Sequence, residues 1–241
     1  MFTTEHFIWL GISFVMICTL LICSVRFKWS KKTCVYIICG ISVLSELTKL
    51  FSHINYDGNH TSAMEHYMLA KSLPFHLCSI LIFVYFYLAL SKNEERKEKL
   101  LSFVVPTGLF GGLLGIVMAT GETSFCDPSS YQSFIYHAGI LWFSLYCILT
   151  KQVKMEFRDY FRNCAALFAL AIVSIWINSV LQVYNTNFFF TVEPPAKDLP
   201  VLNTDHGWYV YFVHLLTVGF FCESAVCLPL GIKSRKKRGE K

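Results

Sequence analysis

Long apolar runs with few charges recur along the whole chain, and they constrain its fold more than any single motif. Hydrophobic residues make up 54% of the 241 residues and charged residues only 15%, whereas a soluble domain carries about 25% charged residues. Seven windows have the length, roughly 17 to 25 residues, that crosses a hydrocarbon core of about 30 Å. They are residues 7–25, 33–51, 73–90, 100–120, 131–150, 163–183 and 208–228. The sequence therefore predicts an all-α polytopic membrane protein, a bundle of seven transmembrane helices.

Basic residues predict the orientation of this bundle. Of the 21 Lys and Arg residues, 18 lie in alternate connections or at the C-terminus. These connections are residues 26–32, 92–99 and 151–162, followed by the segment 233–241. Because Lys and Arg concentrate on the cytoplasmic side, we expect the N-terminus outside and the C-terminus in the cytoplasm. Residues 1–232 then form a single transmembrane domain and residues 233–241 a basic cytoplasmic tail, in the plasma membrane if the host is bacterial.

All eight histidines lie on the predicted outer side or in the outer half of a span. They are His6, His53, His60, His66, His76, His137, His206 and His214. Other polar groups share one layer with them, namely Glu46, Cys78, Asn178 and Gln182. At 1.5 Å per residue, His137 and His214 lie about 9 Å below the outer ends of their spans. Polar groups inside a bilayer usually face the bundle interior, so the pattern predicts a polar cavity that opens toward the outer leaflet.

Cys78 differs from the other nine cysteines because it lies in this layer, near the start of a predicted helix. The dipole at a helix N-terminus favours a thiolate. On a regular helix the side chains of His76 and Cys78 diverge by about 200°, so a base for Cys78 should come from another helix, and His137 is the better candidate. His76 or Glu46 could then orient the pair. The alternatives are an inert buried thiol and a surface ion pair of Glu46 with Lys49.

The motif Leu73-Pro74-x-His76-Leu77-Cys78 resembles the signature of the YwaF-like family of integral membrane proteins. Further matching features are Pro106 with Gly111-Gly112, Tyr136-His137-Ala138-Gly139, Asn178 and Asn187 with Pro194-Pro195, and Gly207-Trp208-Tyr209. The likeness covers roughly residues 35 to 225. A eukaryotic relative of that family is a phospholipid acyltransferase that moves polyunsaturated acyl chains between lipids through a cysteine nucleophile. The resemblance implies that Cys78 is the nucleophile and that phospholipids or lysophospholipids are the substrates.

The leading hypothesis is a lipid-active acyltransferase or transacylase that needs no cofactor. Cys78 would attack an ester carbonyl, His137 would move the proton, and Asn178 or a backbone amide would stabilise the oxyanion. The predicted substrate-binding residues are Glu46, Asn178, Gln182 and His214. We expect membrane lipids and no nucleic acid as partners, because the net charge of +5 reflects the Lys and Arg residues of the predicted cytoplasmic side.

Two alternatives use the same polar layer. The first is a zinc-dependent membrane lipid hydrolase, in which His76, His137 and His214 would supply three ligands and leave a position for water. The sequence contains no compact HxxxH or HExxH spacing. The second alternative is a small-solute transporter or a receptor, although the chain shows no clear inverted repeat.

Overall fold

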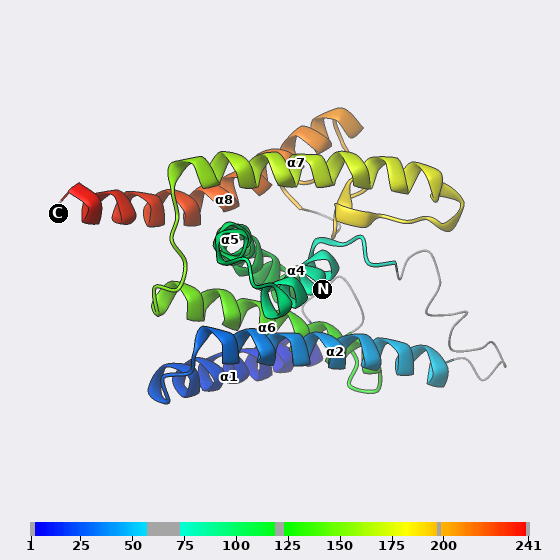
Figure 1. Ribbon diagram of the computed structural model, residues 1–241. Helices are drawn as coiled ribbons and strands as arrows, with labels where there is room; N and C mark the ends of the chain where they lie inside the picture. Colours follow the sequence, from blue (N-terminus) through cyan, green and yellow to red (C-terminus); the bar gives the residue numbers. More distant parts are fainter. Residues whose placement is uncertain (1–2, 57–72, 119–122, 197–198, 240–241) are drawn as a thin grey trace.

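The computed structural model describes residues 3–56, 73–118, 123–196 and 199–239 (Figure 1). Within these residues all the regular secondary structure is helical, as predicted. The elements in chain order are α1 (Thr4–Arg26), α2 (Lys31–Tyr56), α4 (Leu77–Leu90), α5 (Glu94–Met118), α6 (Pro128–Leu149), α7 (Phe157–Val180), the short 3-10 helices η2 (Gln182–Tyr184) and η3 (Phe188–Phe190), and α8 (Trp208–Gly239).

Among the described residues, five helices, α1, α5, α6, α7 and α8, are long and apolar enough to cross a membrane. The other two predicted spans correspond to α2 and α4. Helix α2 has 26 residues but carries the charges of Lys31, Lys32, Glu46 and Lys49. Helix α4 has only 14 residues, about 21 Å at 1.5 Å per residue, which is shorter than a hydrocarbon core of about 30 Å. The helices thus support an integral membrane protein, but their length and composition do not confirm the predicted seven spans.

The start of α4 differs from the prediction. The helix was expected to begin at Leu73 but begins at Leu77, with His76 as an extended N-cap residue. A proline disfavours the helical conformation in the residue before it, and Pro74 follows Leu73 directly. The backbone N–H of Phe75 donates a hydrogen bond to the Leu73 carbonyl (2.8 Å), which closes a turn in place of the first helical turn. Cys78 is therefore the second residue of the helix and lies close to its N-terminal end.

Two other boundaries also differ from the expected ones. Helix α7 ends at Val180, so Gln182 lies beyond it in η2 and not in the last turns of a span. Helix α8 continues through the start of the predicted tail and ends at Gly239.

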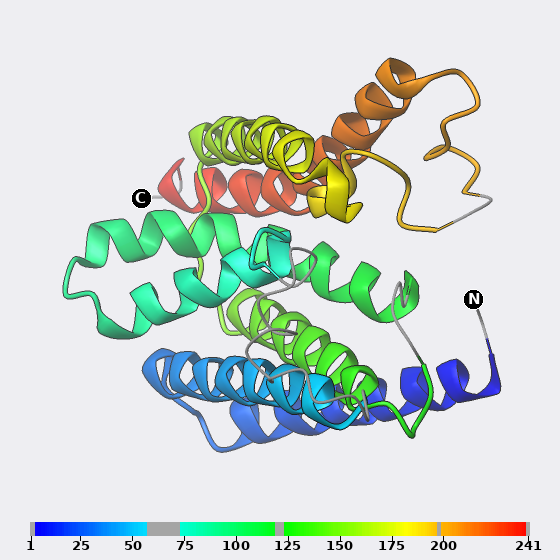
Figure 2. The same ribbon diagram turned by 90° about the vertical axis from the view of Figure 1, so that its right-hand side faces the viewer.

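The helices pack in three layers, which can be followed in Figures 1 and 2. Helices α1, α2 and α6 form one layer, α4 and α5 lie in the middle, and α7 with α8 forms the third. Helices α5 and α6 contain the longest sets of buried residues. The core between the first two layers includes Tyr85, Val104, Trp142 and Phe143, all fully buried. The α5–α6 pair is therefore the centre of the bundle.

Glycines allow α5 to approach α6 very closely. A Cβ atom at Gly108 would lie 2.6 Å from the Ser144 Oγ, and one at Gly112 would lie 2.9 Å from the His137 carbonyl oxygen. Gly111 is different, because no atom outside its own stretch of helix lies within 4 Å of a Cβ built there. Small residues at helix contacts are typical of membrane proteins, where close van der Waals packing drives association.

We expect Gly112→Ala to destabilise the bundle, because the added methyl group has no space against the α6 backbone. Overpacking of this kind costs about 1–3 kcal/mol. Thermal unfolding of the purified protein in detergent would measure the change. Gly111→Ala is the matched control and should unfold at or above the temperature of the unaltered protein, since the methyl group meets nothing and alanine favours the helix. Equal destabilisation by both substitutions would contradict the close α5–α6 contact.

Candidate functional site

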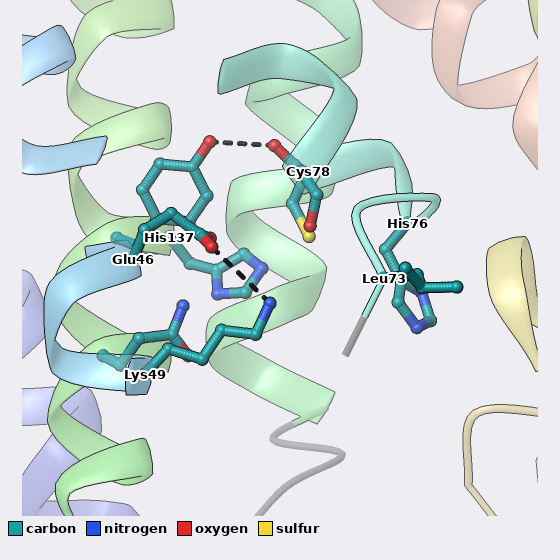
Figure 3. Close-up of a pocket in the computed structure, with 9 residues that line it drawn as sticks. Glu46, Lys49, Leu73, His76, Cys78 and His137 are labelled. Carbon is teal, nitrogen blue, oxygen red and sulfur yellow. Dashed lines mark hydrogen bonds and ion pairs between the residues drawn. The ribbon is translucent and has the colours of Figure 1, made fainter. Parts of the chain in front are cut away.

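A pocket of about 190 Å³ lies between α2, the start of α4 and α6. Its lining includes Glu46 and Lys49 from α2, His76 and Cys78 from the start of α4, and Tyr136 and His137 from α6 (Figure 3). Four of the seven predicted site residues, Glu46, His76, Cys78 and His137, are therefore brought together around one pocket.

The centre of this pocket is formed by Cys78 and His137. The Cys78 side chain points toward the His137 ring from the facing helix (Figure 3), and both residues line the same pocket. A thiol that faces an imidazole has the elements of an activated nucleophile. This arrangement agrees with the expected pairing of residues at similar depth on different helices.

The orientation of the His137 ring is fixed by a hydrogen bond within α6. The Nδ1 atom lies 2.7 Å from the carbonyl oxygen of Ser133, four residues earlier. A carbonyl oxygen can only accept, so Nδ1 carries the proton and donates it. In the neutral ring Nε2 is then the unprotonated nitrogen, and it is the atom that faces Cys78 (Figure 3). The ring is thereby prepared to accept a proton from the thiol.

Gly115 on α5 provides the space that the His137 ring occupies. A Cβ atom at Gly115 would lie 2.2 Å from the His137 Cδ2 and 2.5 Å from Nε2. The ring thus rests directly on the α5 backbone. Only glycine leaves room for it in this position.

Cys78 is held against α6 through its backbone. The hydroxyl group of Tyr136 donates a hydrogen bond to the Cys78 carbonyl oxygen (2.8 Å). The first backbone hydrogen bond of the helix runs from the Ile80 N–H to the His76 carbonyl oxygen (3.0 Å). The backbone N–H groups of Leu77, Cys78 and Ser79 precede that bond and have no intrahelical acceptor. The thiol therefore lies beside the positive end of a helix dipole.

The His76 ring points away from His137, toward the aromatic residues of η3 (Figure 3). Its centroid lies 5.2 Å from that of Phe188 and 5.6 Å from that of Phe190. The partner that orients the His137 Nδ1 is thus the Ser133 carbonyl oxygen and neither His76 nor Glu46. His76 therefore lines the pocket while its ring packs against Phe188 and Phe190.

Glu46 and Lys49 form the ion pair that their spacing on α2 suggested, with the Lys49 Nζ 3.7 Å from the Glu46 Oε2. Both side chains are partly shielded, with exposed fractions of 19% for Lys49 and 28% for Glu46. The pair lines the same pocket as Cys78. It therefore places one positive and one negative charge beside the thiol and the imidazole.

The other three predicted site residues lie outside this pocket. Asn178 is buried and binds η3, with its side-chain amide donating to the Phe188 carbonyl oxygen (3.0 Å) and its Oδ1 accepting from the Phe188 N–H (3.0 Å). Gln182 is exposed in η2. The Nδ1 of His214 binds the Val201 carbonyl oxygen (3.0 Å). Of the predicted site residues, the structure thus brings together around this pocket those on α2, at the start of α4 and on α6.

The remaining histidines do not extend the site among the described residues. His6 is buried, and its Nε2 lies 3.0 Å from the Ile116 carbonyl oxygen. His206 is exposed, and the side chains of His53, His60 and His66 lie outside the part of the chain that the structure describes. No group of three or more His, Cys, Asp or Glu side chains that could hold a metal ion occurs in the described part of the chain. Among the described residues, His76, His137 and His214, the ligands in the zinc alternative, thus do not form such a group.

Sequence reasoning missed two residues that position the His137 ring, Ser133 and Gly115. Ser133 precedes His137 by four residues, and a spacing of four places residues on one helix face, so this partner could have been found. Gly115 belongs to another helix, and no sequence spacing relates it to His137. Tyr136 was noted only as part of a motif, without its hydrogen bond to Cys78.

Comparison with known proteins places the chain among transmembrane proteins. Residues 1–224 match the TMEM164 family. The chain belongs to this family. No curated protein and no solved structure matches the chain. The pocket that contains Cys78 and His137 lies within the part of the chain that matches the TMEM164 family.

We expect Gly115→Ala to lower the rate at which N-ethylmaleimide alkylates Cys78 near neutral pH. The added methyl group would displace the His137 ring, which would then no longer be in place to accept the proton of the Cys78 thiol. Mass spectrometry of the peptide that contains Cys78 separates its modification from that of the other nine cysteines. The rate should approach that of His137→Ala, whereas Gly111→Ala should leave it unchanged. If Gly115→Ala reacted like the unaltered protein while His137→Ala reacted slowly, the ring would not depend on this contact.

Proposed function

We propose that this protein is a lipid-active membrane acyltransferase, or transacylase, with Cys78 as its nucleophile and His137 as its general base. One observation carries the proposal: the His137 Nδ1 is bound to the Ser133 carbonyl oxygen, and its Nε2 faces the Cys78 thiol. The resemblance of the Cys78 motif to the YwaF-like family, with its acyltransferase relative, supports acyl transfer as the reaction. The substrates are phospholipids and lysophospholipids, and the proposed reaction requires no cofactor.

The first half of the reaction forms an acyl-thioester. The Cys78 sulfur attacks the ester carbonyl carbon of the donor lipid while its proton passes to the His137 Nε2. As the tetrahedral intermediate collapses, the ester C–O bond breaks, and the leaving oxygen takes that proton and departs as a lysolipid hydroxyl group. The acyl chain remains on Cys78. One ester bond has been exchanged for one thioester bond.

The second half reverses these steps with a different alcohol. The hydroxyl group of an acceptor lysolipid gives its proton to the His137 Nε2 and attacks the thioester carbonyl carbon. The C–S bond then breaks, and the sulfur regains the proton from His137. An exchange of esters in this way needs no nucleotide, and the chain has no nucleotide-binding motif.

We assign the stabilisation of the oxyanion to backbone amides at the start of α4. The N–H groups of Leu77 and Cys78 precede the first hydrogen bond of the helix, which begins at the Ile80 N–H. Preorganised donors of this type act on the charge that develops in the transition state. Asn178, which the sequence suggests for this role, is instead bound to Phe188.

The proposal includes the arrangement in the membrane. We infer seven crossings, with α2 and α4 added to the five apolar helices, the N-terminus outside and the C-terminal segment in the cytoplasm. The distribution of Lys and Arg supports this orientation. Cys78 then lies toward the outer leaflet, and the donor lipid reaches it laterally. No observation favours the zinc hydrolase, the transporter or the receptor over this function.

Cys78→Ala should abolish acyl transfer and leave the fold intact, because it removes one sulfur atom from a helix end. His137→Ala should lower the rate by about 10²- to 10⁴-fold, the usual contribution of a general base. His76→Ala should have a milder effect, since the His76 ring packs on η3 and does not contact the reacting atoms. Transfer of a labelled acyl chain between phospholipid and lysophospholipid in proteoliposomes measures all three, and chelators should have no effect.

The same assay can overturn the proposal. Full activity of Cys78→Ala together with loss of activity on chelation would replace the thiol mechanism with the metal-dependent one. Uptake of a solute by the same proteoliposomes, without acyl transfer, would support a transporter instead.

The orientation can be tested separately with single cysteines introduced into the C-terminal segment 233–241 of a variant that lacks other reactive cysteines. We expect a membrane-impermeant maleimide to label them only after the cytoplasmic side has been opened. A cysteine in the connection between α5 and α6 should show the opposite accessibility. Labelling of the C-terminal segment in intact cells would place the Cys78 pocket on the wrong side for an outer-leaflet substrate.

A further inference from the structure

A second pocket, of about 210 Å³, lies at the opposite end of α4 from Cys78. It is formed by the start of α2, the end of α4 and the start of α5. Its wall combines the lysines Lys31, Lys32 and Lys97 with apolar residues such as Val35 and Leu88. The pocket is therefore amphipathic, with apolar groups beside ammonium groups.

The pocket has an excess of positive charge. Three lysines line it, and Glu94 is the acidic residue among its lining residues. The Glu94 Oε1 accepts a hydrogen bond from the Lys97 Nζ (2.8 Å). The Glu94 side chain is 70% exposed, whereas that of Lys97 is 19% exposed. Exposed ion pairs are weak, so an anion in the pocket can compete for Lys97. The Lys32 Nζ lies 5.7 Å from the centre of the Tyr36 ring.

The start of α2 adds to this excess. Lys31 and Lys32 are its first two residues, and its first turn contains no acidic residue. Helix α5, which begins beside it, has Glu94 and Glu95 in the same position. Lysines at the positive end of a helix dipole are unfavourable, and an anion at that end relieves the repulsion.

Lysines prefer the cytoplasmic side of a membrane, which explains why they occur in these connections. It does not explain why lysines from two connections line the same pocket. That preference acts on any position in a short loop. Here Lys31 and Lys32 come from one connection and Lys97 from the next, and they converge on apolar side chains of α4. Lys151 and Lys154, in the third basic connection, do not line this pocket.

We propose that this pocket binds the head group of an anionic phospholipid. The phosphate group lies among Lys31, Lys32 and Lys97, which attract it as point charges. The first carbons of the lipid pack on Val35, Leu88 and Leu101, so the apolar wall selects a lipid over free phosphate. Basic pockets between transmembrane helices commonly bind such head groups. This site is separate from Cys78 and does not depend on the proposed acyl transfer.

The test uses the full-length protein in an uncharged detergent and dioctanoyl phosphatidylglycerol as the probe, with binding measured by calorimetry. The variant Lys31→Gln/Lys97→Gln should bind about thirtyfold more weakly, as the loss of two lysine–lipid contacts predicts. Lys151→Gln/Lys154→Gln removes the same charge elsewhere and should bind like the unaltered protein. Lys31→Arg/Lys97→Arg should keep its affinity, which separates loss of charge from loss of fold.

Several results would overturn the proposal. Equal weakening in both glutamine variants would mean that the lipid is attracted by the overall charge of this side and not by the pocket. Equal affinity for dioctanoyl phosphatidylcholine would remove the selectivity for anionic lipids. Competition by inorganic phosphate at the concentrations at which the lipid binds would show that the apolar wall contributes nothing.

Discussion

The close approach of α5 to α6 is the contact on which the rest of the structure depends. At Gly112 the two backbones come so near that a methyl group would have no space. At Gly108 the Ser144 side chain occupies that space, and at Gly115 the His137 ring does. Within lipid the hydrophobic effect does not drive helices together, so association relies on close packing of this kind. The contact that holds the centre of the bundle thus also sets the direction of the proposed base.

The proposed nucleophile is held from the layers on both sides of it. On one side Tyr136 of α6 binds the Cys78 carbonyl oxygen. On the other, Phe188 of η3 packs on Phe75 and His76, in the turn that leads into α4. Asn178 fixes η3 in turn, through both backbone groups of Phe188. Asn178 therefore helps to position Cys78 indirectly, because it holds Phe188, which packs on the turn before α4.

The sequence allowed the helical class and the pairing of Cys78 with His137 to be predicted, because span boundaries and the helical rise fix the depth of a residue. Depth does not fix direction around the helix axis. For this reason Asn178 was assigned to the cavity, although it points to a loop that follows its own helix. Ser133 was predictable from its spacing to His137 on one helix. Gly115 was not, because the pairing of α5 with α6 is a tertiary contact without a local signal.

The shortness of α4 has a consequence for the acyl group that the proposed reaction places on Cys78. In the proposed seven-span arrangement, a helix of about 21 Å does not cover a hydrocarbon layer of about 30 Å. With the C-terminal end of α4 at the cytoplasmic surface, the turn before α4 would then lie below the outer membrane surface. Irregular backbone at that depth is tolerated only where protein buries it or water reaches it. If water fills the pocket beside this turn, a thioester on Cys78 would be exposed to hydrolysis. Loss of fatty acid would then compete with transfer whenever acceptor lipid is scarce.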